Sequence, residues 1–302
     1  MVGKRVIEAM CRIRCTAEVA SEFRYENPII GKRDMCIVIS QSGETADTLA
    51  AMRLAKQAGA FTIAIVNVVS STIAREADGV LYTWAGPEIS VATTKAYSAQ
   101  LSALYLISVK IARVRGLISI GDERALCAEL QRLPECIEQT LKCQSDMQRI
   151  ATLYANRSSV FFLGRGLDYA AALEASLKLK EISYIHSEAY AAGELKHGTI
   201  SLIEEGTLVV ALATQPALFE KTVSNIREVV SARRKRRARH HGRFHRGRVS
   251  LPAHRAPAEV PELKFSASLS IIPMQLLAYY IAVERNCDVD KPRNLAKSVT
   301  VE

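Results

Sequence analysis

Three charged side chains and a histidine in the second half of the sequence are suited to proton transfer. Glu174, Lys178 and Glu181 are separated by four and three residues, a spacing that places them on one face of a helix. His197 follows in a glycine-flanked, alanine-rich segment. Carboxylates and histidines exchange protons, and a nearby ammonium stabilises a carboxylate. The group predicts an acid–base site; the alternative is a solvated helix face with ion pairs of about 0.2–0.5 kcal/mol each.

A loop rich in hydroxyl groups follows an apolar run in the first half. The run 36–39 ends in Ser-Gln-Ser-Gly-Glu-Thr, residues 40–45, and a helix-prone stretch comes next. The unpaired N–H groups and positive dipole end of a helix, together with hydroxyl donors, suit a phosphate. The loop's glycine would let the backbone approach that ligand closely. The pattern predicts an anion site, and the alternative is an ordinary Ser or Thr N-cap.

The elements that must position these residues predict an α/β protein. In the first half the expected strands are near 16–20 and at 34–39, 61–68 and 79–83, and the expected helices are 2–13, 44–58 and 93–114. A helix over 122–153, broken at Pro134, would connect two halves. The second half repeats the layout, with strands 159–163 and 207–213 and helices 171–184, 218–230 and 271–280. Apolar strands that alternate with helices indicate parallel sheets covered on both faces.

Length and composition limit the class of protein. The 302 residues suggest about two domains, and 49% apolar residues suffice for sizeable cores. We find no run of about 18 apolar residues, so no membrane span is expected. The N-terminus lacks the apolar core of a signal peptide, and the seven scattered cysteines are typical of reduced thiols. A cytoplasmic protein is therefore expected.

One segment carries the excess positive charge. The net charge is +9, and residues 233–248 contain nine Lys or Arg and no acid. Subtracting these nine from 40 leaves 31 basic residues, which balance the 31 acidic ones. The protein is thus neutral apart from one basic run, and apolar periodicity is lost over 231–258.

Four segments, in order, resemble the isomerising glutamine–fructose-6-phosphate aminotransferases, also called glucosamine-6-phosphate synthases. They are Ser-Gln-Ser-Gly-Glu-Thr-Ala-Asp-Thr-Leu (40–49), Leu-Lys-Leu-Lys-Glu-Ile-Ser-Tyr-Ile-His (177–186), Glu-Ala-Tyr-Ala-Ala-Gly-Glu-Leu-Lys-His-Gly (188–198) and Asp-Lys-Pro-Arg-Asn-Leu-Ala-Lys-Ser-Val-Thr-Val-Glu (290–302). A lone Ser-x-Ser-Gly-x-Thr occurs in many sugar isomerase (SIS) domains, whereas four long matches in order are specific. The resemblance covers nearly the whole chain except about 231–258.

The resemblance implies two SIS subdomains, 1–145 and 146–302, each a parallel sheet flanked by helices in three αβα layers. It implies conversion of fructose 6-phosphate toward glucosamine 6-phosphate, and a homodimer without metal or cofactor. The second subdomain would include the catalytic tail and the aberrant basic segment 231–258. The residues that would hold the sugar phosphate are Ser40, Gln41, Ser42 and Thr45, with Thr93 nearby where the family commonly has Ser.

The resemblance also implies catalytic roles. Glu181 would move a proton between C1 and C2 of the sugar, with Glu174 and Lys178 in support. His197 would assist ring opening, reaching in from the neighbouring subunit. Lys297 would form an imine with the open-chain ketose, because an imine makes C2 more electrophilic. The proton-transferring carboxyl would need a pKa raised by a dry site.

The sequence departs from the family pattern in four places. The glutaminase domain with its N-terminal cysteine nucleophile is not found, so no glutamine hydrolysis is expected. The first SIS strand and its Cys-Gly-Thr-Ser loop would precede residue 1, which leaves the first sheet without its leading strand. Thr199 stands where the family usually has Pro. The fourth departure is the segment 231–258, which we interpret as a stretch read in a shifted frame; comparison of the coding DNA in three frames would decide this.

Three other functions compete with the aminotransferase. A free-standing phosphosugar isomerase or deaminase is one, although the tail 293–297 favours the aminotransferase. A non-enzymatic phosphosugar-binding protein whose basic run binds nucleic acid, anionic lipid or a nuclear import receptor is the second. Nucleic-acid binding is not favoured, because such runs are normally tails, whereas this one interrupts a domain. The third is an inactive product of a damaged gene.

Overall fold

The computed structural model describes residues 1–237 and 263–297. Contacts divide the described residues into two compact units, the first formed by 3–123 with the tail residues 293–297, the second by the described residues of 124–292. The expected boundary at 145 lies inside the second unit, and the tail, expected in the second half, belongs to the first. The basic run from 238 onward lies outside the described residues.

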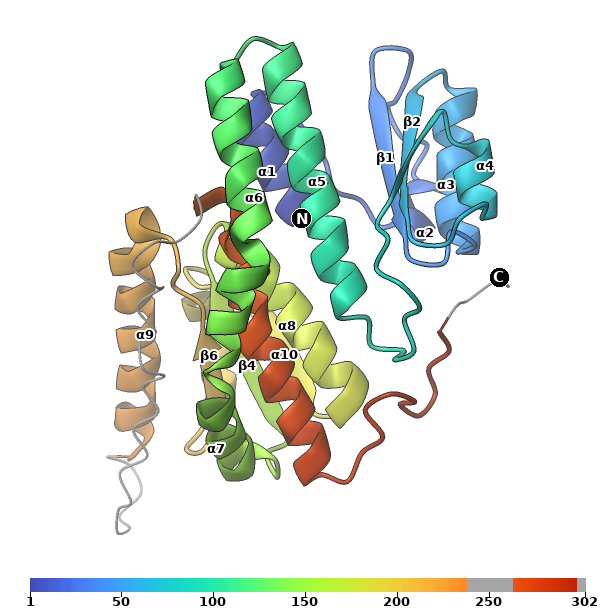
Figure 1. Cartoon of the computed structure of the whole chain (residues 1–302). Helices are drawn as coiled ribbons and strands as arrows, with labels where there is room; N and C mark the ends of the chain where they lie inside the picture. Colours follow the sequence, from blue (N-terminus) through green and yellow to red (C-terminus); the bar gives the residue numbers. More distant parts are fainter. Residues whose placement is uncertain (238–262, 298–302) are drawn as a thin grey trace. The chain divides into compact units, whose positions relative to one another are not determined.

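Unit 1 contains a parallel sheet of three strands. They are β1 (Met35–Ser40), β2 (Phe61–Val66) and β3 (Gly79–Tyr82), in the order β1-β2-β3 (Figure 1). Met35 pairs with Phe61, and Ile63 pairs with Gly79. The parallel sheet and the expected strands 34–39, 61–68 and 79–83 are confirmed.

Helices cover both faces of this sheet. On one face α3 (Ala46–Gln57) and α4 (Thr72–Glu76) form a core with β1 and β2 that includes Val38, Met52, Val66 and Ile73. On the other face α5 (Lys95–Val114) packs through Ala103 and Leu104 against Ile65. Helix α1 (Val2–Cys11) packs on α5, where the Cys11 Sγ donates to the Ser108 carbonyl at 3.2 Å. The layers are therefore αβα.

The strand expected near 16–20 does not form. These residues lie outside the sheet, and the short helix α2 (Ala20–Phe23) begins among them. A strand needs a hydrogen-bonded neighbour, and in the described part of the chain β1 pairs only with β2. The strand prediction was wrong because local β-propensity does not supply that neighbour.

Unit 2 contains a second parallel sheet with a different order. Its strands are β4 (Ser159–Gly164), β5 (His186–Ala191) and β6 (Leu208–Ala211), in the order β5-β4-β6. Strand β4 is central and its residues 160–164 are buried. Strand β5 was missed in the sequence, because His-Ser-Glu-Ala-Tyr-Ala alternates polar and small residues and is not an apolar run.

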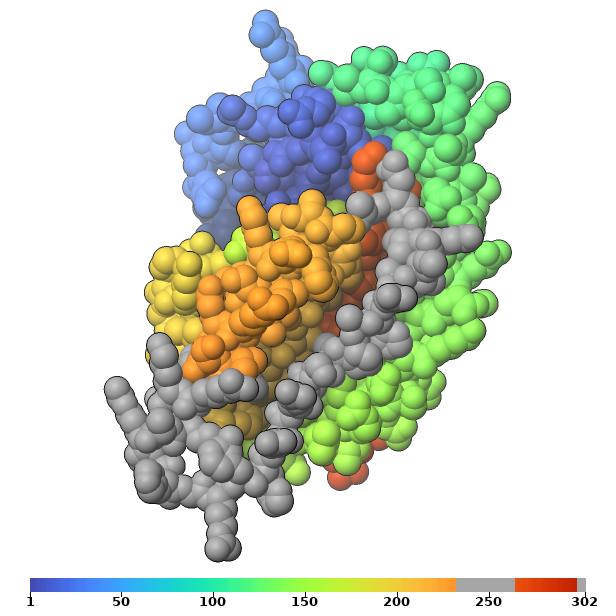
Figure 2. Space-filling model, turned by 90° about the vertical axis from the view of Figure 1, so that its left-hand side faces the viewer, coloured from blue at the N-terminus to red at the C-terminus, as the bar shows by residue number. Residues whose placement is uncertain are grey.

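The helices of unit 2 enclose this sheet. Helix α8 (Leu167–Ser183) packs on β4 and β5, and α10 (Ser266–Glu284) packs on α8 and α7 (Gln144–Tyr154). Helix α9 (Pro216–Arg237) lies at the surface, orange in Figure 2, and buries Val229 in a core of β4 and β6. Helix α9 extends into the basic run, beyond the expected end at 230.

The connecting helix does not break at its proline. Helix α6 runs Ile120–Leu141 with Pro134 inside it, and α7 follows from Gln144. A proline removes one helical hydrogen bond, and this helix continues in spite of that cost. The break therefore falls after Leu141.

Helix α10 is apolar enough to have been a membrane candidate. An 18-residue stretch of this helix has a mean hydropathy of 1.5, so the helix is long and apolar enough to cross a membrane by length and composition alone. However, 61% of the apolar stretch is buried, and α10 lies against α8 and α7. Burial by neighbouring helices accounts for its composition as a core helix.

Candidate functional site

In the acid–lysine–acid row of α8, defined as Glu174, Lys178 and Glu181, the lysine is buried and the two carboxylates are partly buried. Lys178 Nζ lies 2.6 Å from Glu181 Oε2 and 3.5 Å from Glu174 Oε1. The exposed fractions of the three side chains are 16%, 6% and 22% in chain order. A solvated helix face would leave such long side chains open to water, so that alternative is wrong. One ammonium therefore pairs with two carboxylates at a site that is largely shielded from solvent.

The electrostatics of this row favour a protonatable carboxyl. Burial raises the pKa of Glu174, and the neighbouring Glu181 charge raises it further, while Lys178 opposes both effects. Two carboxylates that share one cation cannot both be fully compensated, so one of them takes up a proton more readily. The row therefore has the composition of a proton-transfer group, and that role stays a prediction.

His197 lies in the same unit on a separate element. It ends the short 3-10 helix Leu195–His197, which is anchored by the buried Leu195. Its side chain is exposed, and its backbone N–H donates to the Glu194 carbonyl at 3.0 Å. Within the described part of the chain no hydrogen bond or ion pair joins His197 to the row of α8. The expected role of His197, ring opening from the neighbouring subunit, therefore stays a prediction.

The hydroxyl loop, residues 40–45, connects the carboxyl end of β1 to α3 in unit 1. Ser40 Oγ lies 2.9 Å from Thr45 Oγ1 and accepts the Gly43 N–H at 3.0 Å. Ser42 Oγ accepts the Glu44 N–H at 3.2 Å. Thr45 is the N-cap residue of α3, but its side chain caps no helix amide. The ordinary N-cap alternative is therefore not realised, and the first amides of α3 have no side-chain cap.

Gly43 and Gln41 fix the course of this loop. Gly43 has a φ of 68°, in the left-handed region that favours glycine. The Gln41 carbonyl accepts the Asn67 N–H at 3.1 Å, which ties the loop to the end of β2. The loop lies at the carboxyl ends of parallel strands, where open α/β sheets bind ligands. Its shape and its donors suit a phosphate.

Lys297 and Thr93 come together in unit 1 although they are far apart in the sequence. Lys297 Nζ donates to the Ser90 carbonyl at 2.5 Å and to Thr93 Oγ1 at 3.3 Å. Both acceptors lie just before α5, on the segment predicted to support the phosphate site. The structure therefore pairs the predicted imine-forming lysine with a predicted substrate contact.

The predicted residues accordingly fall into two units. Unit 1 holds the hydroxyl loop, Thr93 and Lys297, whereas unit 2 holds the row of α8 and His197. Each unit supplies one kind of chemistry: hydrogen-bond donors and an amine in the first, acids and a histidine in the second.

Sequence reasoning missed a polar cluster on β5. Tyr190 donates its phenol proton to Glu188, and His186 Nε2 lies 3.3 Å from the other oxygen of Glu188. The bond to Glu188 raises the pKa of Tyr190. The alternation of His, Glu and Tyr at every second position was the available signal, since such residues share one face of a strand.

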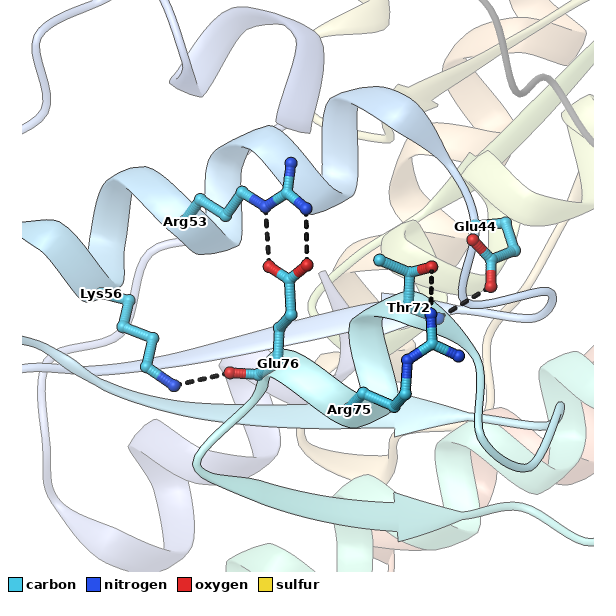
Figure 3. A network of polar contacts seen from close by, with 6 residues as sticks. All are labelled: Glu44, Arg53, Lys56, Thr72, Arg75 and Glu76. Carbon is cyan, nitrogen blue, oxygen red and sulfur yellow. Dashed lines mark hydrogen bonds and ion pairs between the residues drawn. The ribbon is translucent and has the colours of Figure 1, made fainter.

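A second network that was missed joins α3 to α4 (Figure 3). Arg53 Nε and Nη2 donate to the two oxygens of Glu76 at 2.6 and 2.5 Å, and Lys56 Nζ donates to the Glu76 carbonyl at 2.6 Å. Lys56 also lies 2.8 Å from Asp78, whose pKa falls to about 2, chiefly through that bond. The network fixes the two helices that flank the hydroxyl loop.

Comparisons with known proteins show the family of the chain. A family model described as the SIS domain matches residues 1–110 and 153–235. The chain is 55% identical over its whole length to a glutamine–fructose-6-phosphate aminotransferase [isomerizing] of Clostridium tetani, and 47% identical to one of Methanosarcina acetivorans. It covers 50% and 49% of these relatives, so the chain spans about half the length of the curated relatives it matches.

A solved structure gives a fuller match. The C-terminal domain of glucosamine-fructose-6-phosphate aminotransferase from Francisella tularensis is 35% identical, with a TM-score of 0.84. The match covers 97% of this chain and 82% of that domain. A glucosamine-6-phosphate deaminase from Thermotoga maritima is 26% identical, with a TM-score of 0.76.

Proposed function

The chain belongs to the SIS domain family, and we propose that it binds fructose 6-phosphate and catalyses the isomerising step toward glucosamine 6-phosphate. The observation that carries the proposal is the largely buried row of Glu174, Lys178 and Glu181. The 55% identity to isomerising aminotransferases and the match to a C-terminal domain of that enzyme type support the substrate.

In the proposed reaction the predicted residues contribute different steps. The hydroxyl loop binds the sugar phosphate through its hydroxyls and the first amides of α3. The neutral amine of Lys297 adds to the C2 carbonyl of the open-chain ketose, and loss of water leaves an imine. Glu181 takes the proton from C1 and returns it at C2. Lys178 stabilises the Glu181 carboxylate, and Glu174 holds Lys178 in place.

The Lys297 contacts support a resting state before substrate arrives. At neutral pH a lysine amine is ordinarily an ammonium, and an ammonium that donates to Ser90 and Thr93 cannot attack a carbonyl. It must lose a proton and leave these acceptors, so sugar binding near Thr93 would free the amine for imine formation.

Loss of activity in single variants tests the proposal. Conversion of fructose 6-phosphate to glucose 6-phosphate is measured for the wild-type chain, Glu181→Gln and Lys297→Ala. Removing a positioned base costs about 10²–10⁴-fold, so Glu181→Gln should fall by about that factor. Lys297→Ala removes the amine that forms the imine and should lose activity at least as strongly. Glu220→Gln makes the same change at an exposed position of α9 and should retain wild-type activity. Equal activity in all four proteins would overturn the assignment.

The proposal includes a homodimer in the cytoplasm with His197 acting in the neighbouring subunit. The exposed position of His197 and the seven free thiols support it. Mixing His197→Ala with Glu181→Gln chains tests the sharing: in mixed dimers one site has both wild-type groups, which restores about a quarter of the activity. No recovery in a mixture shown to exchange subunits would mean that each site uses its own histidine.

A further inference from the structure

Glu44 is the one charged member of the hydroxyl loop, and it bonds to a different segment. Its Oε1 accepts the Thr72 N–H at 2.7 Å, and Figure 3 shows the carboxylate directed at Thr72. Thr72 is the first residue of α4, and the side chain of the preceding Ser71 makes no capping bond. Glu44 therefore does for α4 what an N-cap residue normally does, although it lies 28 positions away.

Residues 71–73, at the start of α4, also contact the hydroxyl loop directly. The Ile73 N–H donates to the Gly43 carbonyl at 3.0 Å. A Cβ on Gly43 would lie 2.0 Å from Ser71 Oγ, so the loop backbone rests directly on the Ser71 side chain. Ser71 is 3% exposed, and its hydroxyl has no hydrogen-bond partner among the described residues. Contacts to 71, 72 and 73 thus join the loop to the start of α4.

The far end of α4 is fixed independently. The Arg53 and Lys56 bonds to Glu76 hold α4 against α3, and α3 begins where the hydroxyl loop ends. With α4 fixed to α3, the Glu44 bond closes a ring of elements: loop, α3, α4 and back to the loop (Figure 3). Such a ring holds the loop in one conformation before a ligand arrives, which reduces the entropy lost on binding.

The negative charge of Glu44 would oppose phosphate binding unless another group compensated it. A carboxylate beside a phosphate would repel it, and a loop built for phosphate gains nothing from an unpaired acid. The bond from Thr72 lowers the pKa of Glu44, with a smaller contribution from Arg75. The acid is thus compensated by groups of α4 and directed at α4.

We propose that Glu44 is a positioning residue of the sugar-phosphate site, which shapes the hydroxyl loop through the Thr72 N–H. The inference rests on the proposed function, since it deepens the role of that loop. It predicts an effect on affinity for the sugar phosphate and none on proton transfer, because Glu44 belongs to the phosphate-binding loop and the row of α8 is a separate group.

Glu44→Ala and Thr72→Pro test this pair from its two sides. Proline removes the N–H that Glu44 accepts, and the first residue of a helix tolerates proline. Each variant should raise the KM for fructose 6-phosphate, and its Kd by calorimetry, about tenfold, with kcat changed less than about twofold. Because they break the same bond, the double variant should be no worse than either single one.

Conservative rescue separates positioning from a general structural defect. Glu44→Gln keeps an acceptor oxygen for the Thr72 N–H and should recover most of the affinity. Glu26→Ala, at an exposed acid of the same unit, should bind as the wild type does. Amide hydrogen exchange at Thr72 should be faster in Glu44→Ala than in wild type, and this readout needs no ligand.

Ser42→Ala distinguishes failure of this inference from failure of the proposed function. If Ser42→Ala weakens fructose 6-phosphate binding and Glu44→Ala does not, the loop binds the sugar phosphate and the positioning role is wrong. Additive losses in the double variant, or a lower kcat with unchanged KM in Glu44→Ala, would also overturn it. If wild type does not bind fructose 6-phosphate, or Ser42→Ala binds it equally well, the proposed function fails first.

Discussion

The hydroxyl loop of unit 1 and the acid–lysine–acid row of unit 2 both follow a parallel strand, yet they are built differently. The loop is made of short polar groups that bond to one another and to backbone amides. The row is made of long charged side chains on a helix, with its lysine only 6% exposed. Binding an anion needs fixed donors, whereas moving a proton needs charges whose solvation has been reduced.

The strand that precedes the loop and the strand that precedes the row also differ, in their number of partners and in their burial. Strand β4 has a hydrogen-bonded strand on each side and buries residues 160–164, so the helix after it follows the central strand of its sheet. Strand β1 has one partner in the described residues, and Met35 and Ile39 are 41% and 40% exposed. The row of α8 should therefore depend on packing and charge balance, and the loop on local hydrogen bonds. The four predictions below test that difference.

Removing the lysine of the row should have the largest effect on stability. Lys178→Met leaves two partly buried carboxylates without their cation, which should lower the free energy of unfolding by about 3 kcal/mol at pH 7. The loss should shrink at pH 4.5, where the acids are more easily protonated. Urea unfolding at both pH values measures it. Lys180→Met removes the same charge from an exposed position of α8 and should cost under about 0.5 kcal/mol. Equal losses in Lys178→Met and Lys180→Met would show that the charges of the row are solvated.

Arg285 tests how firmly the end of α8 is held. Its Nε donates to the Ser183 carbonyl at 2.9 Å and its Nη1 to the Ala155 carbonyl at 2.8 Å. These carbonyls lie at the ends of α8 and α7, so Arg285→Ala should lower the free energy of unfolding by about 2 kcal/mol. Chemical denaturation measures this loss. Arg285→Lys can make only one of the two hydrogen bonds, so its stability should lie between those of wild type and Arg285→Ala. Full stability in Arg285→Ala would contradict the assigned role.

Gly43→Ala would show whether packing also matters in the loop. The positive φ costs an alanine about 1 kcal/mol, and its Cβ would collide with the Ser71 side chain. We expect a loss of about 1–2 kcal/mol in the free energy of unfolding, together with weaker fructose 6-phosphate binding. Ser71→Gly in the same chain removes the obstructing atoms and should recover the steric part. No recovery would mean that backbone conformation alone sets the cost.

The smallest effect is expected from Glu174→Gln and depends on pH. Because the pKa of Glu174 is raised in the folded protein, the native state binds a proton that the unfolded state has lost. Stability from this group is therefore present below the ordinary value of 4.5 and is lost as pH rises from there to the raised pKa. Between pH 4 and 7 the free energy of unfolding, measured by urea denaturation, should fall less in Glu174→Gln than in wild type, with a difference of about 1 kcal/mol or less. A steeper fall would contradict the direction of the shift.

Local features were predictable from the sequence. The strands 34–39 and 159–163 are apolar runs, and the hydroxyl loop and the row of α8 follow from residue order and the helical repeat. The strand near 16–20 and the break at Pro134 were wrong, and β5 was missed. Each error concerns an element whose fate depends on neighbours: strand partners in two cases, and the surroundings of a proline in the third.

The sequence by itself determined which groups share a surface: three charges on one face of α8, and hydroxyls gathered at the end of β1. Helical periodicity and strand–helix turns are set by local backbone geometry, which is why spacing suffices. Only the tertiary structure decided that the row is largely buried, that Lys297 donates to Thr93 and that Glu44 bonds to Thr72. Burial and these bonds join residues distant in the chain, and the free energy that selects them comes from packing of the whole unit.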